Sequence, residues 1–354
     1  MTKRIEYIDA LRGFTMMLVV FAHVETYVLS IEPNSTLISE LFISFRMPLF
    51  FFISGYISYK RGFVWNSSSY LINLLKKTRI QIIPTIIFGL SFTYLFEKGN
   101  ICDFVNNYHK FGYWFTICLW GIFVILYTCN FILFKSSKKN KEKLSILVLS
   151  MIAVVLTLFR FLYDKHPLVA EISDVFCFHQ VCVYYPFFIF GYFVSHNKDK
   201  FHGFLDNNIV QFCVPTLFII AFYYKRTLPD SFYLINGGML LYRSFEYIII
   251  GLLGICFVYN IFRKNTVFST DSYCVVLLRE VGRRTLDIYM LHYFFLSKIP
   301  DLGTFLVSST TNLTLELLVV SMLSIAVIAC CLLISNILRM SKNLSYILFG
   351  VKVK

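Results

Sequence analysis

A histidine and an arginine stand inside the first long apolar stretch of the chain, and their types and spacing suggest catalysis. Arg12 and His23 are eleven residues apart, which on an α-helix is three turns plus about 20° and ~16 Å along the axis. Both side chains are therefore predicted to lie on one helix face. Asp9, three residues before Arg12, is predicted to share that face and to pair with Arg12. Because a neutral imidazole is the commonest general base, we interpret His23 as a candidate catalytic base.

Simpler explanations exist for both residues. An arginine near a helix end can extend its charge to the membrane surface, so Arg12 could serve only that purpose. A lone histidine in a membrane helix, such as His23, could be a packing residue. Ionisable groups inside a membrane are nevertheless rare, and by default they face the protein interior at functional sites. Glu25 is predicted to point to nearly the opposite side of the helix from His23.

Three further stretches combine apolar residues with groups that could bind or react. "SFRMPLFFFISGY" places Arg46 near the predicted depth of His23 and also carries Ser54. "KKTRIQIIP" is predicted to be a basic cytoplasmic turn that leads into a helix kinked by Pro84. "GRRTLDIYMLH" carries Tyr289 and His292 on one helix face.

These residues must be positioned by helices that cross a membrane. The chain has 354 residues, of which 57% are hydrophobic and 15% charged, and apolar runs of about 20 residues recur along it. We therefore predict an all-α polytopic membrane protein in a single domain, 1–354, with both termini cytoplasmic. Lys and Arg gather in the segments that this topology makes cytoplasmic, as the positive-inside rule requires. About ten helices are predicted, at 8–29, 41–59, 80–96, 113–134, 144–163, 176–194, 210–224, 239–262, 285–299 and 313–338.

The cysteine content and the net charge argue against a disulfide framework, a metal site and a nucleic-acid partner. The ten cysteines lie mostly inside apolar runs and form no C-x-x-C, so neither a disulfide framework nor a metal site is predicted. The formal net charge of +13 could suggest a nucleic-acid partner, but in a membrane protein cytoplasmic loops account for such an excess.

The motifs resemble those of the acyltransferase 3 family of membrane-bound acyltransferases. The family pattern of Arg, ten residues and His matches Arg12 and His23 within a D-x-L-R-G context. The pattern F-[HR]-M-P-L-F-F-x-x-S-G-[YF] matches 45–56, where many members have His in place of Arg46. Weaker resemblances are to W-F at 114–115, Y-x-P-F-F-x-x-G at 184–191 and I-Y-L-x-H at 288–292. The family's R-x-x-R is represented here by Lys76-x-x-Arg79, which keeps the charge but loses one guanidinium fork.

This resemblance implies a reaction and its substrates. An acyl group, expected to be acetyl, would pass from cytoplasmic acyl-CoA to a hydroxyl of a cell-surface polysaccharide or lipid-linked glycan. The enzyme would be a multi-pass protein of the cytoplasmic (inner) membrane, with acyl-CoA as co-substrate and no permanently bound cofactor. Its CoA-binding residues would be Asp9, Arg12, Lys76, Lys77 and Arg79, with Arg283 and Arg284 as further candidates. Its catalytic residues would be His23 as base, with Arg46, Ser54 and Tyr185 in orienting or oxyanion roles.

Alternatives remain for several of these residues and for the function. Lys76, Lys77 and Arg79 could be charges that only set the topology, and Ser54 could be a small helix-packing residue. Tyr185 could be an interior aromatic beside the kink at Pro186. A non-enzymatic flippase or transporter of lipid-linked oligosaccharides would also carry intramembrane charges, although transporters often have internal repeats and none is visible here. A polysaccharide polymerase would usually carry a large outer loop, and every predicted outer loop is short.

Overall fold

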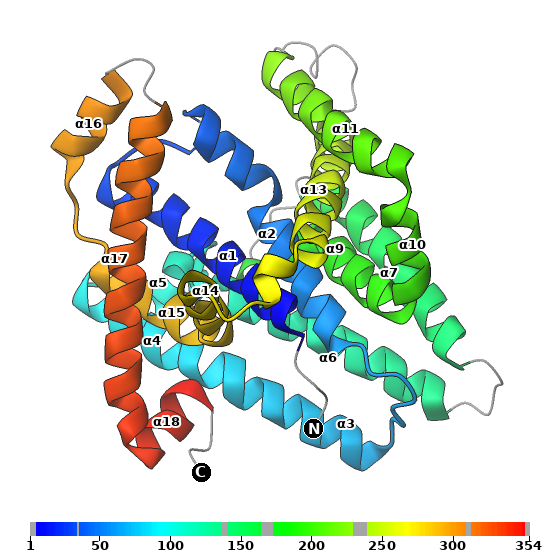
Figure 1. The fold of residues 1–354 in the computed structure, drawn as a ribbon. Coiled ribbons are helices and arrows are strands. Elements are labelled where there is room, and N and C mark those ends of the chain that lie inside the picture. Colours follow the sequence, from blue (N-terminus) through cyan, green and yellow to red (C-terminus); the bar gives the residue numbers. More distant parts are fainter. Residues whose placement is uncertain are drawn as a thin grey trace. The chain divides into compact units, whose positions relative to one another are not determined.

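The computed structural model is built from helices throughout the part of the chain that it describes. That part comprises 5–33, 35–135, 141–163, 173–228, 239–308 and 313–350, and it contains no β-strand. The chain divides into two compact units, and Figure 1 labels helices of both. The first unit holds Met1–Ile53 and Asn197–Asn336, and the second holds Ser54–His196 and Ile337–Lys354.

The first unit is organised around the N-terminal helix. Its helices, of which α2 and α17 also extend into the second unit, are α1 (Glu6–His23), α2 (Leu37–Ser58), α10 (Lys198–Asp206), α11 (Asn208–Thr227), α13 (Met239–Lys264), α14 (Tyr273–Arg283), α15 (Thr285–Leu291), α16 (Pro300–Ser308) and α17 (Leu313–Met340). A π-helical turn, Val24–Val28, continues α1, and short 3₁₀ turns lie at Thr266–Ser269 and His292–Phe295.

Helices α1 and α14 approach each other closely enough for their backbones to touch. A Cβ atom added to Gly13 would collide with the carbonyl of Leu278, and one added to Gly282 would collide with the carbonyl of Asp9. Only glycine permits backbones to come this near. The glycine that follows Arg12 and the glycine that precedes Arg283 therefore bring the two arginine-bearing helices together.

A helix is predicted over 285–299, but the observed helix is shorter. Helix α15 ends at Leu291 and a 3₁₀ turn follows it. The next residues are not helical. Pro300 disfavours a helical conformation in the residue before it, and the amide of Ile299 donates instead to the carbonyl of Val28, at 2.6 Å. This bond joins the segment to the π-helical turn at the end of α1.

The second unit contains a second correction. Its helices are α3 (Ser67–Lys77), α4 (Ile83–Leu95), α5 (Ile101–Asn106), α6 (Trp114–Lys135), α7 (Lys141–Tyr163), α9 (Phe178–His196) and α18 (Lys342–Phe349), with a π-helical turn at Thr78–Ile82 and a 3₁₀ turn at Lys110–Gly112. The predicted basic turn at 76–84 is therefore helical. Asn66 caps α3 in a reciprocal capping box with Ser69, which starts a helix well before the predicted boundary. Pro84 lies in the first turn of α4, directly after the π-helical turn.

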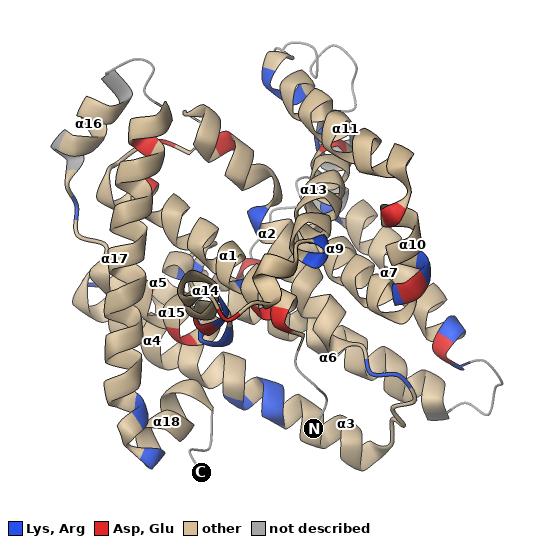
Figure 2. Ribbon diagram, in the orientation of Figure 1, with Lys and Arg blue, Asp and Glu red and all other residues tan. Residues whose placement is uncertain are grey.

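The membrane prediction is confirmed for seven helices in the described part of the chain, by their length and composition. These seven correspond to the predicted helices at 8–29, 41–59, 113–134, 144–163, 210–224, 239–262 and 313–338. Helix α11 has 20 residues, more than predicted and enough to cross a hydrocarbon core. Figure 2 shows charge on α17 near its two ends and none along its middle. The total of ten helices and the cytoplasmic position of the termini stay predictions.

Candidate active site

The first unit brings Arg12 and His23 into contact with one segment, residues 285–293. Nη2 of Arg12 donates to Oγ1 of Thr285 at 2.8 Å. Nδ1 of His23 lies 2.8 Å from Nε2 of His292. Both side chains of α1 therefore face α15 and the 3₁₀ turn that follows it, one at each end. The two groups remain partly exposed, whereas most of their neighbours on α1 are buried.

A chain of hydrogen bonds defines which nitrogen of His23 is basic. Nδ1 of His292 lies 3.0 Å from the carbonyl of Ile288, and a carbonyl can only accept, so this nitrogen carries the proton. In the neutral ring Nε2 of His292 is then an acceptor, and Nδ1 of His23 must donate to it. The lone pair of neutral His23 is thereby assigned to Nε2, which faces the hydroxyl of Tyr293 at 3.3 Å.

The surroundings of the two imidazoles are aromatic and enclosed on one side. Their rings are nearly parallel, with an interplanar angle of 10°. Tyr293 packs against both rings, with centroids 5.0 Å from His23 and 4.1 Å from His292. His292 has no exposed surface, whereas His23 is partly exposed. His23 is thus the member of the pair that a substrate can reach, and His292 is placed to orient it.

A carboxyl pair and an arginine lie beside this site. Glu25 and Glu316 are buried neighbours, with 1% and 7% of their surface exposed. Oγ1 of Thr36 donates to Oε1 of Glu316 at 2.6 Å. The charge of Arg46 acts on both Glu25 and His23. Arg46 is therefore within electrostatic range of His23, and Glu25 is in turn within range of Arg46 and next to Glu316.

A network of ion pairs lies at the N-terminal end of α1. Asp9 accepts from Nε of Arg283 at 3.3 Å. Arg284 contacts Glu280 at 3.1 Å and Asp287 at 3.6 Å. Both arginines that sequence reasoning offered as further phosphate ligands thus have carboxylate partners. Arg12 donates to the hydroxyl of Thr285. A phosphate can displace a neutral hydroxyl from an arginine at lower cost than it can displace a carboxylate.

The other predicted cation-bearing residues belong to the second unit. Nζ of Lys77 lies 3.6 Å from the centre of the Phe123 ring. Arg79 stacks on the ring of Tyr346 at 4.6 Å and donates to its hydroxyl at 2.9 Å. Lys76 is exposed. The three cations lie on the last turn of α3 and the π-helical turn after it.

Ser54 and Tyr185 also belong to the second unit, and both are buried. Near Ser54, α2 packs closely on α9, because a Cβ added to Gly55 would collide with the carbonyl of Phe188. The hydroxyl of Tyr185 makes no hydrogen bond to any residue in the described part of the chain. Their orienting roles stay predictions.

Sequence reasoning did not find the partnership of His292 with His23, nor Thr285, Tyr293 and Glu316. The motif "GRRTLDIYMLH" did single out His292, but its partner is 269 residues away in the chain. No local pattern carries that information. As regards metals, the described ranges contain no group of three or more His, Cys, Asp or Glu side chains arranged to hold an ion.

Comparison with known proteins identifies the family of the chain. No curated protein and no solved structure is significantly similar to the chain. A family model described as an acyltransferase domain, Acyl_transf_3, matches residues 5–336. That range covers nearly the whole chain and includes both ends of the site on α1 and α15. The protein is therefore a membrane acyltransferase that belongs to the acyltransferase 3 family.

Proposed function

We propose that the protein transfers an acyl group, expected to be acetyl, from cytoplasmic acyl-CoA to a hydroxyl of a cell-surface polysaccharide or lipid-linked glycan. The enzyme would act in the cytoplasmic membrane, because its donor is made in the cytoplasm and its acceptor is assembled at or beyond that membrane. The observation that carries the proposal is the hydrogen-bonded chain from Ile288 through His292 to His23.

These two hydrogen bonds support a general-base role for His23. A base needs a lone pair that the acceptor hydroxyl can reach, and the bond from Nδ1 of His23 to His292 leaves that lone pair on Nε2. The ring is held by a buried partner, so it is already oriented before substrate arrives. The last acceptor in this series of hydrogen bonds is the neutral carbonyl of Ile288. In hydrolytic triads a carboxylate occupies the corresponding place.

The transfer can be written with all atoms and protons accounted for. Nε2 of His23 removes the proton of the acceptor hydroxyl, and the oxygen attacks the thioester carbonyl. The resulting oxyanion needs positive charge or donors. Arg46 and the hydroxyl of Tyr293, which lies 3.3 Å from Nε2 of His23, are proposed to supply them. The carbon–sulfur bond then breaks, and the imidazolium of His23 returns the proton to the departing thiolate. The products are the acylated glycan and free CoA.

The donor would be anchored at the other end of α1. The predicted topology makes this end cytoplasmic, and Arg12 is ~16 Å from His23 along the helix axis, which suits the length of an extended pantetheine arm. A CoA phosphate would displace the hydroxyl of Thr285 from Arg12. Lys76, Lys77 and Arg79 are proposed as further phosphate ligands, because cations that the topology predicts to be cytoplasmic and that stand at helical spacing suit a polyphosphate.

Release of CoA from acetyl-CoA tests the function directly. Purified protein is supplied with acetyl-CoA and extracted lipid-linked glycan, and the free thiol is measured with a chromogenic disulfide. We expect thiol release that depends on the glycan and is lost in His23→Gln. His179→Gln is a matched control, since His179 contacts Tyr108 in the second unit.

Two results would contradict the proposal. A flippase or transporter would move the glycan and release no thiol at all. A His23→Gln variant that folds and retains full thiol release would remove the imidazole from the reaction. Independently of these outcomes, mass spectrometry of the glycan product identifies the group that the wild type transfers.

A further inference from the structure

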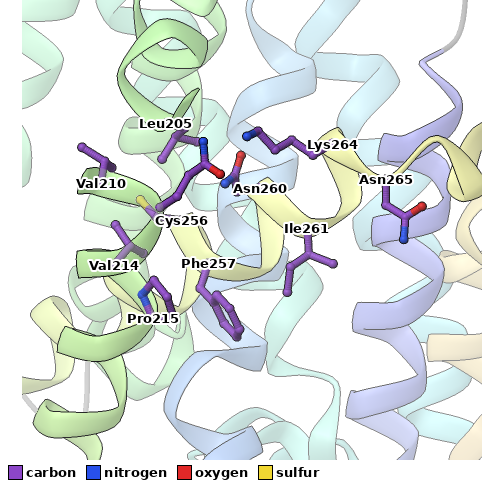
Figure 3. A pocket seen from close by; sticks show the side chains of 11 residues that line it. Leu205, Val210, Val214, Pro215, Cys256, Phe257, Asn260, Ile261, Lys264 and Asn265 are labelled. Carbon is purple, nitrogen blue, oxygen red and sulfur yellow. The ribbon is translucent and has the colours of Figure 1, made fainter. Parts of the chain in front are cut away.

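A groove in the first unit, remote in sequence from α1, is lined by apolar and polar residues in separate regions. It lies between the start of α11 and the end of α13, next to α10, and has a volume of about 380 Å³. Figure 3 shows Val214, Pro215 and Phe257 along one part of it. Its polar lining residues are Gln211, Asn260, Lys264 and Asn265, and the side chain of Lys264 extends back toward Asn260.

The polar part favours an anion. Asn260 accepts a hydrogen bond from Nη2 of Arg263 at 2.7 Å, which leaves its amide NH₂ as a donor. Lys264 is 41% exposed on its side chain and lies 3.6 Å from Asp206. That acid is already bound by Arg263, whose two terminal nitrogens reach both of its oxygens. The pair of cations therefore exceeds the single acid by one charge.

The apolar part opens to the outside of the unit. Helix α11 is the least buried of the seven candidate spans, with 11% of its apolar stretch buried. Ile209 and Phe212, which flank the groove, are 71% and 73% exposed. In a membrane these surfaces face hydrocarbon. The polar residues lie at the helix ends that the sequence predicts to be cytoplasmic, and so at the level of inner-leaflet headgroups.

We propose that this groove binds one anionic phospholipid of the inner leaflet. The headgroup phosphate would accept hydrogen bonds from Lys264 and Asn260, and an acyl chain would lie along Val214, Pro215 and Phe257. An amphiphile with one negative end matches the separation of charge and apolar surface better than a soluble anion, which would leave the apolar part empty.

Native mass spectrometry of the full chain tests the proposal. The protein is released from micelles that contain equal amounts of phosphatidylglycerol and phosphatidylcholine with identical acyl chains. We expect one retained phosphatidylglycerol in preference to phosphatidylcholine. Lys264→Gln should reduce that preference about fivefold, the factor expected for one lysine at an anionic surface. Lys200→Gln is the control, because Lys200 is exposed on α10 but does not line the groove.

A second variant tests the apolar part. Val214→Trp fills the groove and should remove both lipids, and its thermal unfolding is compared with that of the wild type so that loss of fold is recognised. Equal retention of the two lipids by the wild type would overturn the proposal, as would an unchanged preference in Lys264→Gln. A dimer that retains no lipid would show instead that a second copy of the chain covers the groove.

Discussion

His23 and His292 share one hydrogen bond of 2.8 Å although 269 residues separate them in the chain. The first is partly exposed and the second is sealed from solvent. An imidazole that is oriented by a buried partner has one tautomer available to it, which is the requirement for a base that must accept a proton at a defined atom.

Removal of either imidazole should lower the rate of acyl transfer, but to different extents. His23→Gln should lower kcat by about 10²–10⁴, the usual contribution of a general base. His292→Gln should lower it by about tenfold, because the amide oxygen can still accept from His23 while holding it less well. Thiol release at saturating acetyl-CoA measures both.

The ordering of these two effects is the critical result. A greater loss in His292→Gln than in His23→Gln would transfer the base role to the buried ring. Thermal unfolding of each variant serves as the control for misfolding, since His292 is in the interior.

Substitution of Arg12 should affect the donor rather than the chemical step. Arg12→Gln removes the charge proposed to hold a CoA phosphate, so KM for acetyl-CoA should rise about tenfold with little change in kcat. Thr285→Val removes one hydrogen-bond acceptor of Arg12 and should leave KM within about twofold. An unchanged KM in Arg12→Gln would mean that this arginine does not bind the donor.

The contact between α1 and α14 should not tolerate a methyl group. Gly13→Ala and Gly282→Ala place a Cβ against backbone carbonyls, and overpacking of this kind costs about 1–3 kcal/mol. Gly203→Ala is the matched control, because a Cβ added there would meet nothing within 4 Å and the residue is within a helix. Alanine there should stabilise the protein by about 0.4–1 kcal/mol. Chemical or thermal unfolding in detergent compares the three variants, and a neutral Gly282→Ala would refute the close approach.

The stability of the protein should fall as the pH decreases below the ordinary pKa of histidine. Burial, with the nearby charges of Arg263 and Lys198, lowers the pKa of His202, which bonds the hydroxyl of Tyr259 at 2.9 Å. The unfolded chain then binds more protons than the native state between the lowered pKa and about 6.5, so the free energy of unfolding decreases as pH falls through that window.

A substitution isolates this contribution from those of the other histidines. His202→Gln can keep a bond to Tyr259 and does not titrate. Unfolding measured from pH 8 to pH 5 should decline less in the variant than in the wild type. Parallel curves for the two proteins would assign the pH dependence elsewhere.

The long helices could be predicted from the sequence because hydrocarbon selects for length and apolar composition, which are local properties. Helix α17, for example, has only Glu316 and Arg339 as charges, and its predicted end at 338 lies close to its observed end at Met340. The boundaries that were wrong depend on single polar contacts. Asn66 starts α3 by capping it, and Ile299 leaves the helical path to donate to Val28.

The same distinction applies to the candidate site. Arg12 and His23 could be identified because helical geometry relates residues eleven apart. The partners Thr285 and His292 could not, since only the packing of α15 on α1 brings them near. Gly13 and Gly282 permit the neighbouring α1–α14 contact, but their meaning is clear only once the two helices are seen together.

The segment 285–299 is fastened to α1 at both ends, by Arg12 and Thr285 at one and by the bond from Ile299 to Val28 beyond the imidazoles. A shift of the segment along α1 would break both hydrogen bonds. The distance between Arg12 and His23 would therefore be fixed. A donor in which the thioester carbon is too near to its phosphates, or too far from them, could not bind Arg12 and meet His23 at once. Such an enzyme would discriminate among thiol carriers by the span of the carrier, and a truncated thioester without the nucleotide would be a poor substrate even with the same acyl group.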